Sequence, residues 1–322
     1  MTAAGPASPA AGRRRSGRIV VAAFLVAALP AADSTLPSAA EEIPPLNLFQ
    51  RVARAGLVVH VRVHEGALRF ALVDVLEVLK GSAPAERLRI AFRDFNFSRP
   101  RDTDPIVFPD GQEEILFLVP YNQVPRSEKK KEKYRDLFDL LQGPQGRITV
   151  PAEGAGAIFD AVRRLVQVAG QDPASQVEGL RGLLVSENPL LPEAGLEELA
   201  RLRAATPVLY PRLIHLLQSP SPGLRVRSLA LVGQIFSSRP SVPESVSAEE
   251  ALDEAGQALA AVLERARNDP DAGVRVQAVQ ALAAWPAPSD VEADLRAIAS
   301  QDASQEVRFE AERALFRAGA RR

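Results

Sequence analysis

A sequence pattern recurs four times in the C-terminal half of this 322-residue chain, and it constrains the fold more than any other feature. The segments NDPDAGVRVQAVQAL (268–282) and QDASQEVRFEAERAL (301–315) superimpose at an offset of 33 positions. The same register reaches Leu224, once a 17-residue insert is allowed for, and Leu191 a further 33 positions back. A small and an apolar residue recur in each unit: Gly195, Ser228, Ala278 and Ala311, and Leu199, Val232, Leu282 and Leu315. An amphipathic helix pair cannot bury its apolar face alone, so we expect residues 151–322 to stack as an all-α solenoid.

The polar residues of these units show the family that they resemble. The third unit reads D-P-D-x-x-V-R-x-x-A-x-x-A-L from Asp269, which resembles the HEAT repeat, in particular the short form of phycobilin-lyase-like and bacterial extracytoplasmic proteins. That resemblance implies a ladder between neighbouring repeats, made by a turn aspartate and the arginine that opens the second helix. It implies the pairs Asp269–Arg275 and Asp302–Arg308. In the second unit it implies a ladder arginine, Arg225, without a partner aspartate.

The ladder is expected to be strong in the last two units and absent from the first. The second unit keeps Arg225 but has Ser219 at the aspartate position, and the first unit has Ser186 and Pro192 at the two positions. A degenerate first unit is typical of a repeat that caps a solenoid. We therefore expect Arg308→Ala to destabilise the protein more than Arg225→Ala.

Residues 46–150 carry a different pattern, which indicates short β-strands. From Leu57 to His64 apolar residues occupy every second position, a period of two that is typical of a half-buried strand. Further β-rich runs lie at 68–79, 87–92 and 114–120, and the run at 147–151 would close the set. Short strands separated by turn residues predict a small barrel or sandwich. The expected fold is thus an α+β multidomain protein, a small β-barrel followed by the solenoid.

Three strand motifs in this half resemble a known barrel. They are A-x-LVV-x-x-x-V from Ala55, V-x-x-VLKG from Val75 and G-x-E-x-x-LFL from Gly111, within about residues 50–150. They resemble the small OB-like barrel of the netrin-module and metalloprotease-inhibitor type. Inhibitors of that family chelate a catalytic zinc with an N-terminal cysteine, but this chain contains no cysteine. That inhibitory activity is therefore not transferred to this chain.

The first 32 residues have the composition of a secretory signal. Four arginines between Arg13 and Arg18 precede the apolar run IVVAAFLVAAL (19–29), and small residues follow. Eleven apolar residues cover only about 16 Å as a helix, which is too short for a bilayer core of about 30 Å. We expect residues 1–32 to be a signal peptide, 33–45 a linker, and the protein to be periplasmic or extracellular without a stable membrane anchor.

One stretch of the barrel half combines aromatic and basic residues. FRDFNFSRPR (92–101) supplies a candidate ligand surface made by Phe95, Phe97, Arg99 and Arg101, because aromatic and basic groups on an OB-like barrel can bind sugars or single strands. The alternative is that Phe95 and Phe97 close the end of the barrel core, since phenylalanine is commonly buried.

The other polar groups predict no metal centre. His60 and His64 would lie about 13 Å apart along one strand, which is too far for one ion. The acidic residues near the next loop do not match a calcium-binding loop: Asp102, Asp104, Asp110, Glu113 and Glu114. The lysine-rich run 126–138 is expected to be solvated, with an anionic contact as the alternative.

Composition and motifs together favour binding over catalysis. The net charge is −1, and removal of the four N-terminal arginines would make it −5, so a nucleic-acid partner is not expected. No phosphate loop or nucleophile elbow is present, and we expect no enzymatic activity and no cofactor. The hypotheses are a scaffold with a protein partner on the solenoid, an inhibitor or polysaccharide-binding module that uses the barrel, and a carboxylate-dependent hydrolase.

Overall fold

The computed structural model describes residues 45–66, 70–91, 107–121, 135–238 and 248–320. The expected signal peptide, almost all of the linker, the 92–101 ligand surface and most of the lysine-rich run lie outside the described residues. Those expectations therefore remain predictions.

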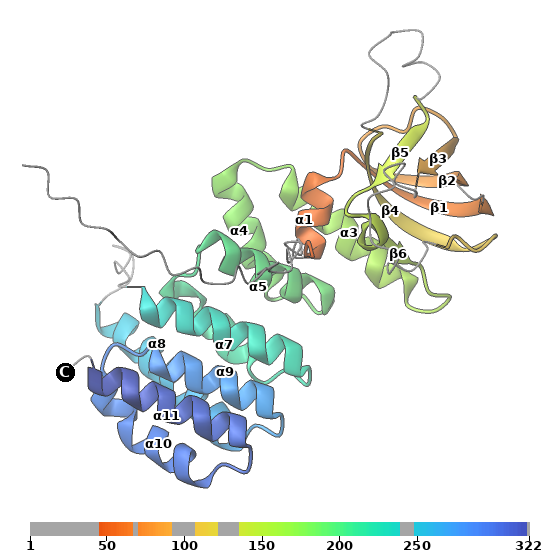
Figure 1. Cartoon of the computed structure of the whole chain (residues 1–322). Coiled ribbons are helices and arrows are strands. Elements are labelled where there is room, and N and C mark those ends of the chain that lie inside the picture. The colour runs from red at the N-terminus through yellow and green to blue at the C-terminus, as the bar shows by residue number, and fades with distance from the viewer. Residues whose placement is uncertain (1–44, 67–69, 92–106, 122–134, 239–247, 321–322) are drawn as a thin grey trace, which may run out of the picture. The chain divides into compact units, whose positions relative to one another are not determined.

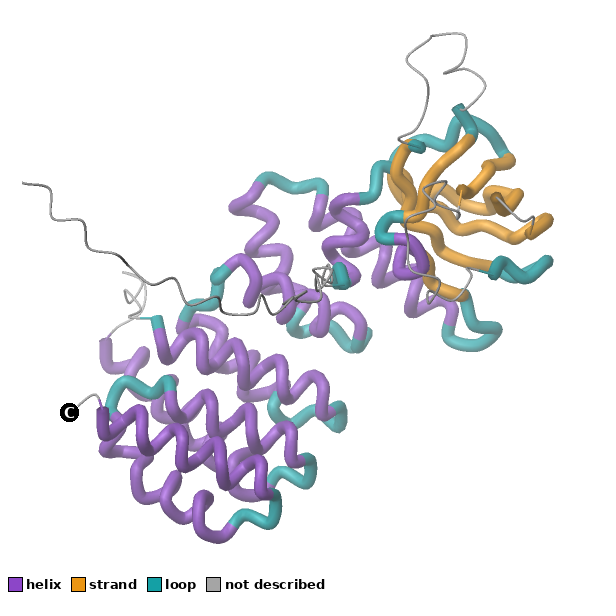
Figure 2. Tube along the Cα trace, in the orientation of Figure 1, coloured by secondary structure: helices purple, strands orange, loops and turns teal. Residues whose placement is uncertain are grey.

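The described part of the N-terminal half contains a closed β-barrel. Its strands are β1 (Leu57–Gly66), β2 (Phe70–Lys80), β3 (Arg87–Ala91), β4 (Glu113–Pro120), β5 (Leu137–Leu140) and β6 (Arg147–Thr149). They follow the order β1-β2-β3-β5-β4-β6, and an additional pairing of β1 with β4 closes the first five strands into a ring. The β3–β5 pairing is parallel and the others are antiparallel. The expected small OB-like barrel is confirmed, and Figure 2 shows its strands.

The barrel interior follows from the two-residue period of its strands. Val59, Val61 and Val63 of β1 share one buried cluster with Leu116 and Leu118 of β4. Residues of opposite parity, such as Val58, Ile115 and Phe117, are also fully buried, but they belong to the cluster that the helices build. One face of the barrel is therefore covered by helices.

Two details of the barrel differ from the sequence-based expectation. The run at 147–151 does form a strand, β6, but β6 lies outside the ring, because in the described part of the chain it pairs with β4 alone, at Glu114, Ile115 and Leu116. The fifth strand of the ring is β5, which begins with the last two residues of the lysine-rich run. A strand of four residues offers only two inward side chains, Phe138 and Leu140, which is too short a pattern to identify next to a run of charges.

The remaining elements are helices. They are α1 (Leu48–Arg54), α3 (Ala155–Ala169), α4 (Pro173–Leu183), α5 (Leu190–Leu202), α6 (Tyr210–Leu216), α7 (Pro222–Ser237), α8 (Ala248–Asn268), α9 (Ala272–Ala283), α10 (Pro288–Gln301) and α11 (Gln305–Ala320). α1 precedes the barrel, yet it contacts α3 and α5. Four helix pairs follow, α4 with α5, α6 with α7, α8 with α9 and α10 with α11. Their second helices contact one another in the order α5, α7, α9 and α11, as Figure 1 shows for the last three.

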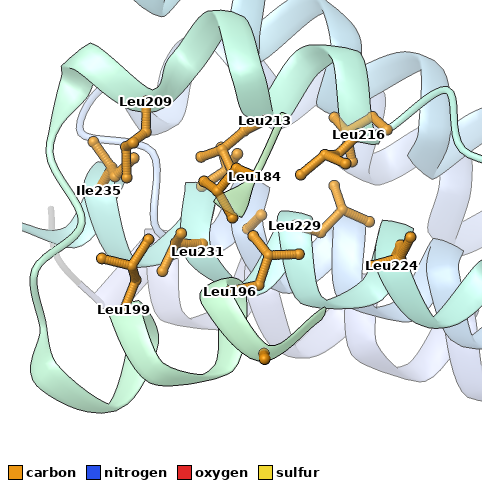
Figure 3. Close-up of a cluster of buried hydrophobic side chains, with 14 of the residues drawn as sticks. Leu184, Leu196, Leu199, Leu209, Leu213, Leu216, Leu224, Leu229, Leu231 and Ile235 are labelled. Atoms are coloured by element: carbon orange, nitrogen blue, oxygen red, sulfur yellow. The ribbon is translucent and has the colours of Figure 1, made fainter. Parts of the chain in front are cut away.

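The repeat register is confirmed by the core of this stack. Its first apolar position is buried in every unit, at Leu191, Leu224, Val274 and Val307. Ser228 occupies the small position of the second unit, where its hydroxyl donates to the carbonyl of Leu224 at 2.8 Å and so remains satisfied. Leucines from several helices fill the space between units (Figure 3). Truncation of one such buried leucine typically costs about 2–5 kcal/mol.

Candidate functional site

The polar ladder of the repeats contains one fully buried ion pair. The Arg225 guanidinium on α7 donates from Nε to Oδ2 of Asp269 at 2.8 Å and from Nη2 to Oδ1 at 2.9 Å. Its Nη1 donates backwards to the carbonyls of Ser219 and Pro220, at 2.8 and 3.2 Å. Both side chains are buried. A buried ion pair is stable when the two groups form a bidentate contact and the remaining guanidinium N–H groups also have hydrogen-bond acceptors, as here.

The next rung repeats this geometry. Arg275 of α9 donates from Nε and Nη2 to Asp302 at 2.8 and 3.0 Å, and from Nη1 to the carbonyl of Asp269 at 2.9 Å. Burial alone would raise the pKa of Asp302, but hydrogen bonds from Arg275 and the Ser304 amide hold that pKa below its usual value. The carboxylate is therefore ionised at neutral pH and stabilises the contact between units.

The pairing differs from the one that the repeat resemblance implied. Arg225 and Arg275 each pair with the aspartate of the following unit and make only backbone hydrogen bonds to their own turn, because the guanidinium extends across the unit boundary. Pro192 of the first unit and Ser219 of the second therefore belong to the same missing rung. The more deeply buried of the two described ion pairs starts at Arg225, and the expectation that Arg225 lacks an aspartate was wrong.

Arg308 is the ladder arginine of the last unit, and among the described residues it pairs with no aspartate. Its Nη1 donates to the carbonyls of Asp302 and Ala303 at 2.6 and 3.2 Å, as the equivalent atoms of the two earlier arginines do. Its Nε and Nη2, which hold the carboxylate in the earlier rungs, make no hydrogen bond or ion pair within the described part of the chain. The last unit thus presents a half-built rung.

Further polar contacts join the first and second units. Arg227 of α7 pairs with Glu193 and Glu197 of α5, each at 2.7 Å. Gln234 donates to the carbonyl of Ala200 at 3.1 Å. These contacts replace the missing rung between the two units.

The histidines of the barrel do not converge. His60 contacts Glu113 at 3.1 Å, and its ring lies against that of Phe159 of α3 in a tilted arrangement, with 4.6 Å between ring centroids. His64 contacts a different carboxylate, Asp74, at 3.4 Å. Among the described residues no group of three potential metal ligands lies together. Of the acidic residues considered for calcium, Asp102 and Asp104 lie outside the described residues, Asp110 accepts from the Gly66 amide at 3.0 Å, and Glu113 pairs with Arg62.

A buried carboxylate at Glu114 was missed by the sequence analysis. The period of β4 places Glu114 on the same strand face as Leu116 and Leu118, inside the barrel, and the residue is fully buried. Arg147 lies 3.5 Å away, but neither carboxylate oxygen accepts a hydrogen bond in the described structure. Burial raises the pKa of Glu114, and the charge of Arg147 only partly offsets this effect. The two-residue period of residues 114–118 could have predicted this burial, because it places Glu114 on the same face as Leu116 and Leu118.

Comparison with known proteins gives only distant structural likenesses. Neither a protein-family model nor a curated protein matches the sequence. An engineered protein of known structure is 16% identical, with a TM-score of 0.36 over 51% of this chain and 76% of that chain. The phycocyanin lyase complex of CpcE and CpcF from a Nostoc species is 14% identical, with a TM-score of 0.36 over 49% and 98%. A designed armadillo repeat protein is 16% identical, with a TM-score of 0.35 over 52% and 77%. These likenesses are too distant to assign an activity or a partner.

Proposed function

We propose that this protein is an exported, non-catalytic scaffold that binds protein partners through its helical repeats. The observation that carries the proposal is the row of second helices, which bonds across unit boundaries at Arg225–Asp269 and Arg275–Asp302. Rungs of this kind hold successive helices in one register, so that side chains from distant parts of the sequence form one continuous surface. Solenoids use such extended surfaces for recognition.

The exposed side of this row follows from the repeat register. Ala230, Gln280 and Arg313 occupy equivalent positions on α7, α9 and α11, and all three are exposed. We call these three residues the row surface. Because they are solvent-exposed, substitutions there change a binding surface at little cost in folding, usually within about 0.5 kcal/mol.

The binding proposal is tested with the full chain as bait in an envelope extract. We expect retained proteins to be lost when Ala230→Arg and Gln280→Glu are introduced together, while the urea unfolding midpoint stays unchanged. Turnover of a peptide or polysaccharide that a single carboxylate substitution abolishes would instead show that the protein is an enzyme. Retention through the barrel alone would favour the barrel-binding hypothesis.

The export proposal has its own experiment. N-terminal sequencing of the protein from the periplasm or medium should find a first residue between about Ala32 and Glu41, as expected for signal cleavage. Within the described residues no helix has the length and apolarity needed to cross a membrane. Full-length protein recovered from the cytosol would contradict export without affecting the binding proposal.

A further inference from the structure

The outer side of α11 differs in two ways from the equivalent side of the inner repeat helices. In α7 this side packs on the next unit: a Cβ atom at Gly233 would lie 3.2 Å from the Cα of Ala281 on α9. The same repeat position is Ala283 on α9 and Phe316 on α11. Phe316 is 78% exposed. The side chain that faces the next unit has therefore changed from glycine or alanine to a large aromatic ring.

A second aromatic residue lies on the same side of α11. Phe309, seven residues before Phe316 and thus about two helical turns away, is 63% exposed. Its equivalents Val226 and Val276 are partly buried against the repeat core. Two exposed phenylalanines beside a half-built ion pair form a compact surface, which we call the end face and define as Arg308, Phe309 and Phe316.

The end face does not fit another repeat stacked as the inner ones are. At the spacing seen at Gly233, even a methyl group is in tight contact with the neighbouring backbone, so a phenylalanine ring at that position would overlap it. Arg308, however, keeps the Nη1 hydrogen bonds to the backbone of its own turn that the arginines of both inner rungs make. The surface thus retains the ion-pair half of the repeat contact and replaces the close helix contact with protruding rings.

We propose that the end face binds a partner protein that presents an aspartate or glutamate carboxylate beside an apolar depression. Arg308 would hold the carboxylate through Nε and Nη2, as Arg225 and Arg275 do, and the two rings would enter the depression. Arginine and aromatic side chains are the residues on which binding energy is concentrated in protein interfaces. This inference rests on the proposed scaffold function and extends its binding surface beyond the row surface to the end face.

Charge favours an acidic partner over a second copy of this chain. The end face carries one charge, that of Arg308, and no carboxylate, and Arg313 on the same helix is already paired with Glu310 at 3.2 Å. A symmetric contact between two end faces would therefore place Arg308 of one copy against a surface that supplies no carboxylate. A partner with a carboxylate at the contact satisfies Arg308.

The test places a photo-cross-linking benzophenone side chain at position 316 of the full chain, in the cells that produce it. We expect illumination to join it to another protein at a segment that contains an acidic residue. With the isolated partner, Arg308→Glu should weaken binding at least about tenfold, and so should Phe309→Ser with Phe316→Ser. Replacement of the contacted acidic residue by arginine in the partner should restore binding to the Arg308→Glu protein.

The control variant is Arg164→Glu, the same charge reversal at an exposed arginine of α3 that belongs to neither the end face nor the row surface. If the end-face variants bind normally while the row-surface variant with Ala230→Arg and Gln280→Glu loses binding, the end-face inference fails and the scaffold function stands. If cross-links join two copies of this chain, or no cross-linked protein forms, the inference is likewise overturned. Unfolding midpoints in urea confirm that each variant is folded, which we expect because Arg308 makes no ion pair within the described chain.

Discussion

Glu114 shows at the residue scale how strand geometry can oppose side-chain chemistry. Its position in β4 directs a carboxylate into the apolar interior that Val61, Leu116 and Leu118 share. Its neighbour Glu113 points to the opposite face, where a hydrogen bond from Arg62 lowers its pKa. Two adjacent glutamates thus have pKa values that are shifted in opposite directions because successive strand residues face opposite sides.

The first prediction is that Glu114→Gln stabilises the protein at neutral pH. A raised pKa in the folded state means that folding favours the protonated acid, so this stabilisation is complete below the unfolded pKa and is lost as pH rises through the folded pKa. The amide carries no charge to desolvate and should raise the unfolding free energy at pH 7 by on the order of 1 kcal/mol. Urea melts between pH 3.5 and 7.5 should show this gain shrinking towards acid.

Glu113→Gln is the matched control for that prediction. Its lowered pKa contributes stability above the unfolded pKa, and that contribution disappears as pH falls through the folded pKa. The control should therefore destabilise the protein at pH 7 and approach the wild type at acid pH. Equal pH profiles for the two variants would contradict the opposite environments of the two glutamates.

The element scale explains which parts of the ladder the sequence could predict. The register identified the ladder arginines and aspartates, because periodicity in sequence becomes periodicity in space when units stack. It could not show that Arg225 pairs with Asp269, 44 residues away, because an offset fixes equivalent positions and not the direction in which a side chain crosses a boundary.

The barrel strands show the same limit of a sequence pattern. The strand β5 was missed because four residues carry too little pattern, whereas the longer strands β1 and β4 were predicted nearly to their ends.

The second prediction reverses the order of effects inferred from the sequence. Arg225→Ala leaves Asp269 buried without its main cationic partner, and loss of one member of a buried pair typically costs about 3–5 kcal/mol. Arg308→Ala removes hydrogen bonds only to Asp302 and Ala303, so we expect a loss of about 1 kcal/mol or less. Urea unfolding of the two variants measures the difference directly. Comparable losses would contradict the cross-unit pairing.

The third prediction concerns the contact between α7 and α9. Gly233→Val introduces a branched side chain where even a Cβ atom would lie 3.2 Å from the Ala281 backbone, and such overpacking typically costs about 1–3 kcal/mol. Phe316→Val places the same residue at the equivalent but exposed position of α11, where the change should stay within about 0.5 kcal/mol. If both changes were tolerated equally in thermal melts, the packing contrast that defines the end face would be contradicted.

At the scale of the whole molecule, the barrel and the helices share one apolar cluster. Val58, Ile115 and Phe117 belong to the barrel strands but to the core cluster of the helices. Lys80, at the end of β2, donates to three carbonyls at the end of α1, those of Val52, Ala53 and Ala55, at 2.7–3.0 Å. The sequence predicted two domains with a boundary at residue 150, because composition changes there. It carried no signal for the shared core, since an outward-facing valine or phenylalanine does not indicate what will cover it.

The last prediction is that the barrel and the repeats unfold in one transition. Phe117 is fully buried between the two, beneath the Arg51 guanidinium at 5.4 Å, and truncation of a buried phenylalanine typically costs about 3–5 kcal/mol. The chain has a single tryptophan, Trp285, which contacts Phe236 within the repeats and so reports on them alone. We expect Phe117→Ala to lower the urea midpoint of Trp285 fluorescence and the exchange protection of β1 and β4 amides together. Leu88→Ala is the control, because Leu88 lies inside the barrel but outside the shared cluster. Its truncation can change the Trp285 transition only if the loss of stability in the barrel is transmitted to the repeats. If Phe117→Ala weakened only the barrel amides and left the Trp285 transition unchanged, the two halves would be independent domains, as the composition boundary alone suggests.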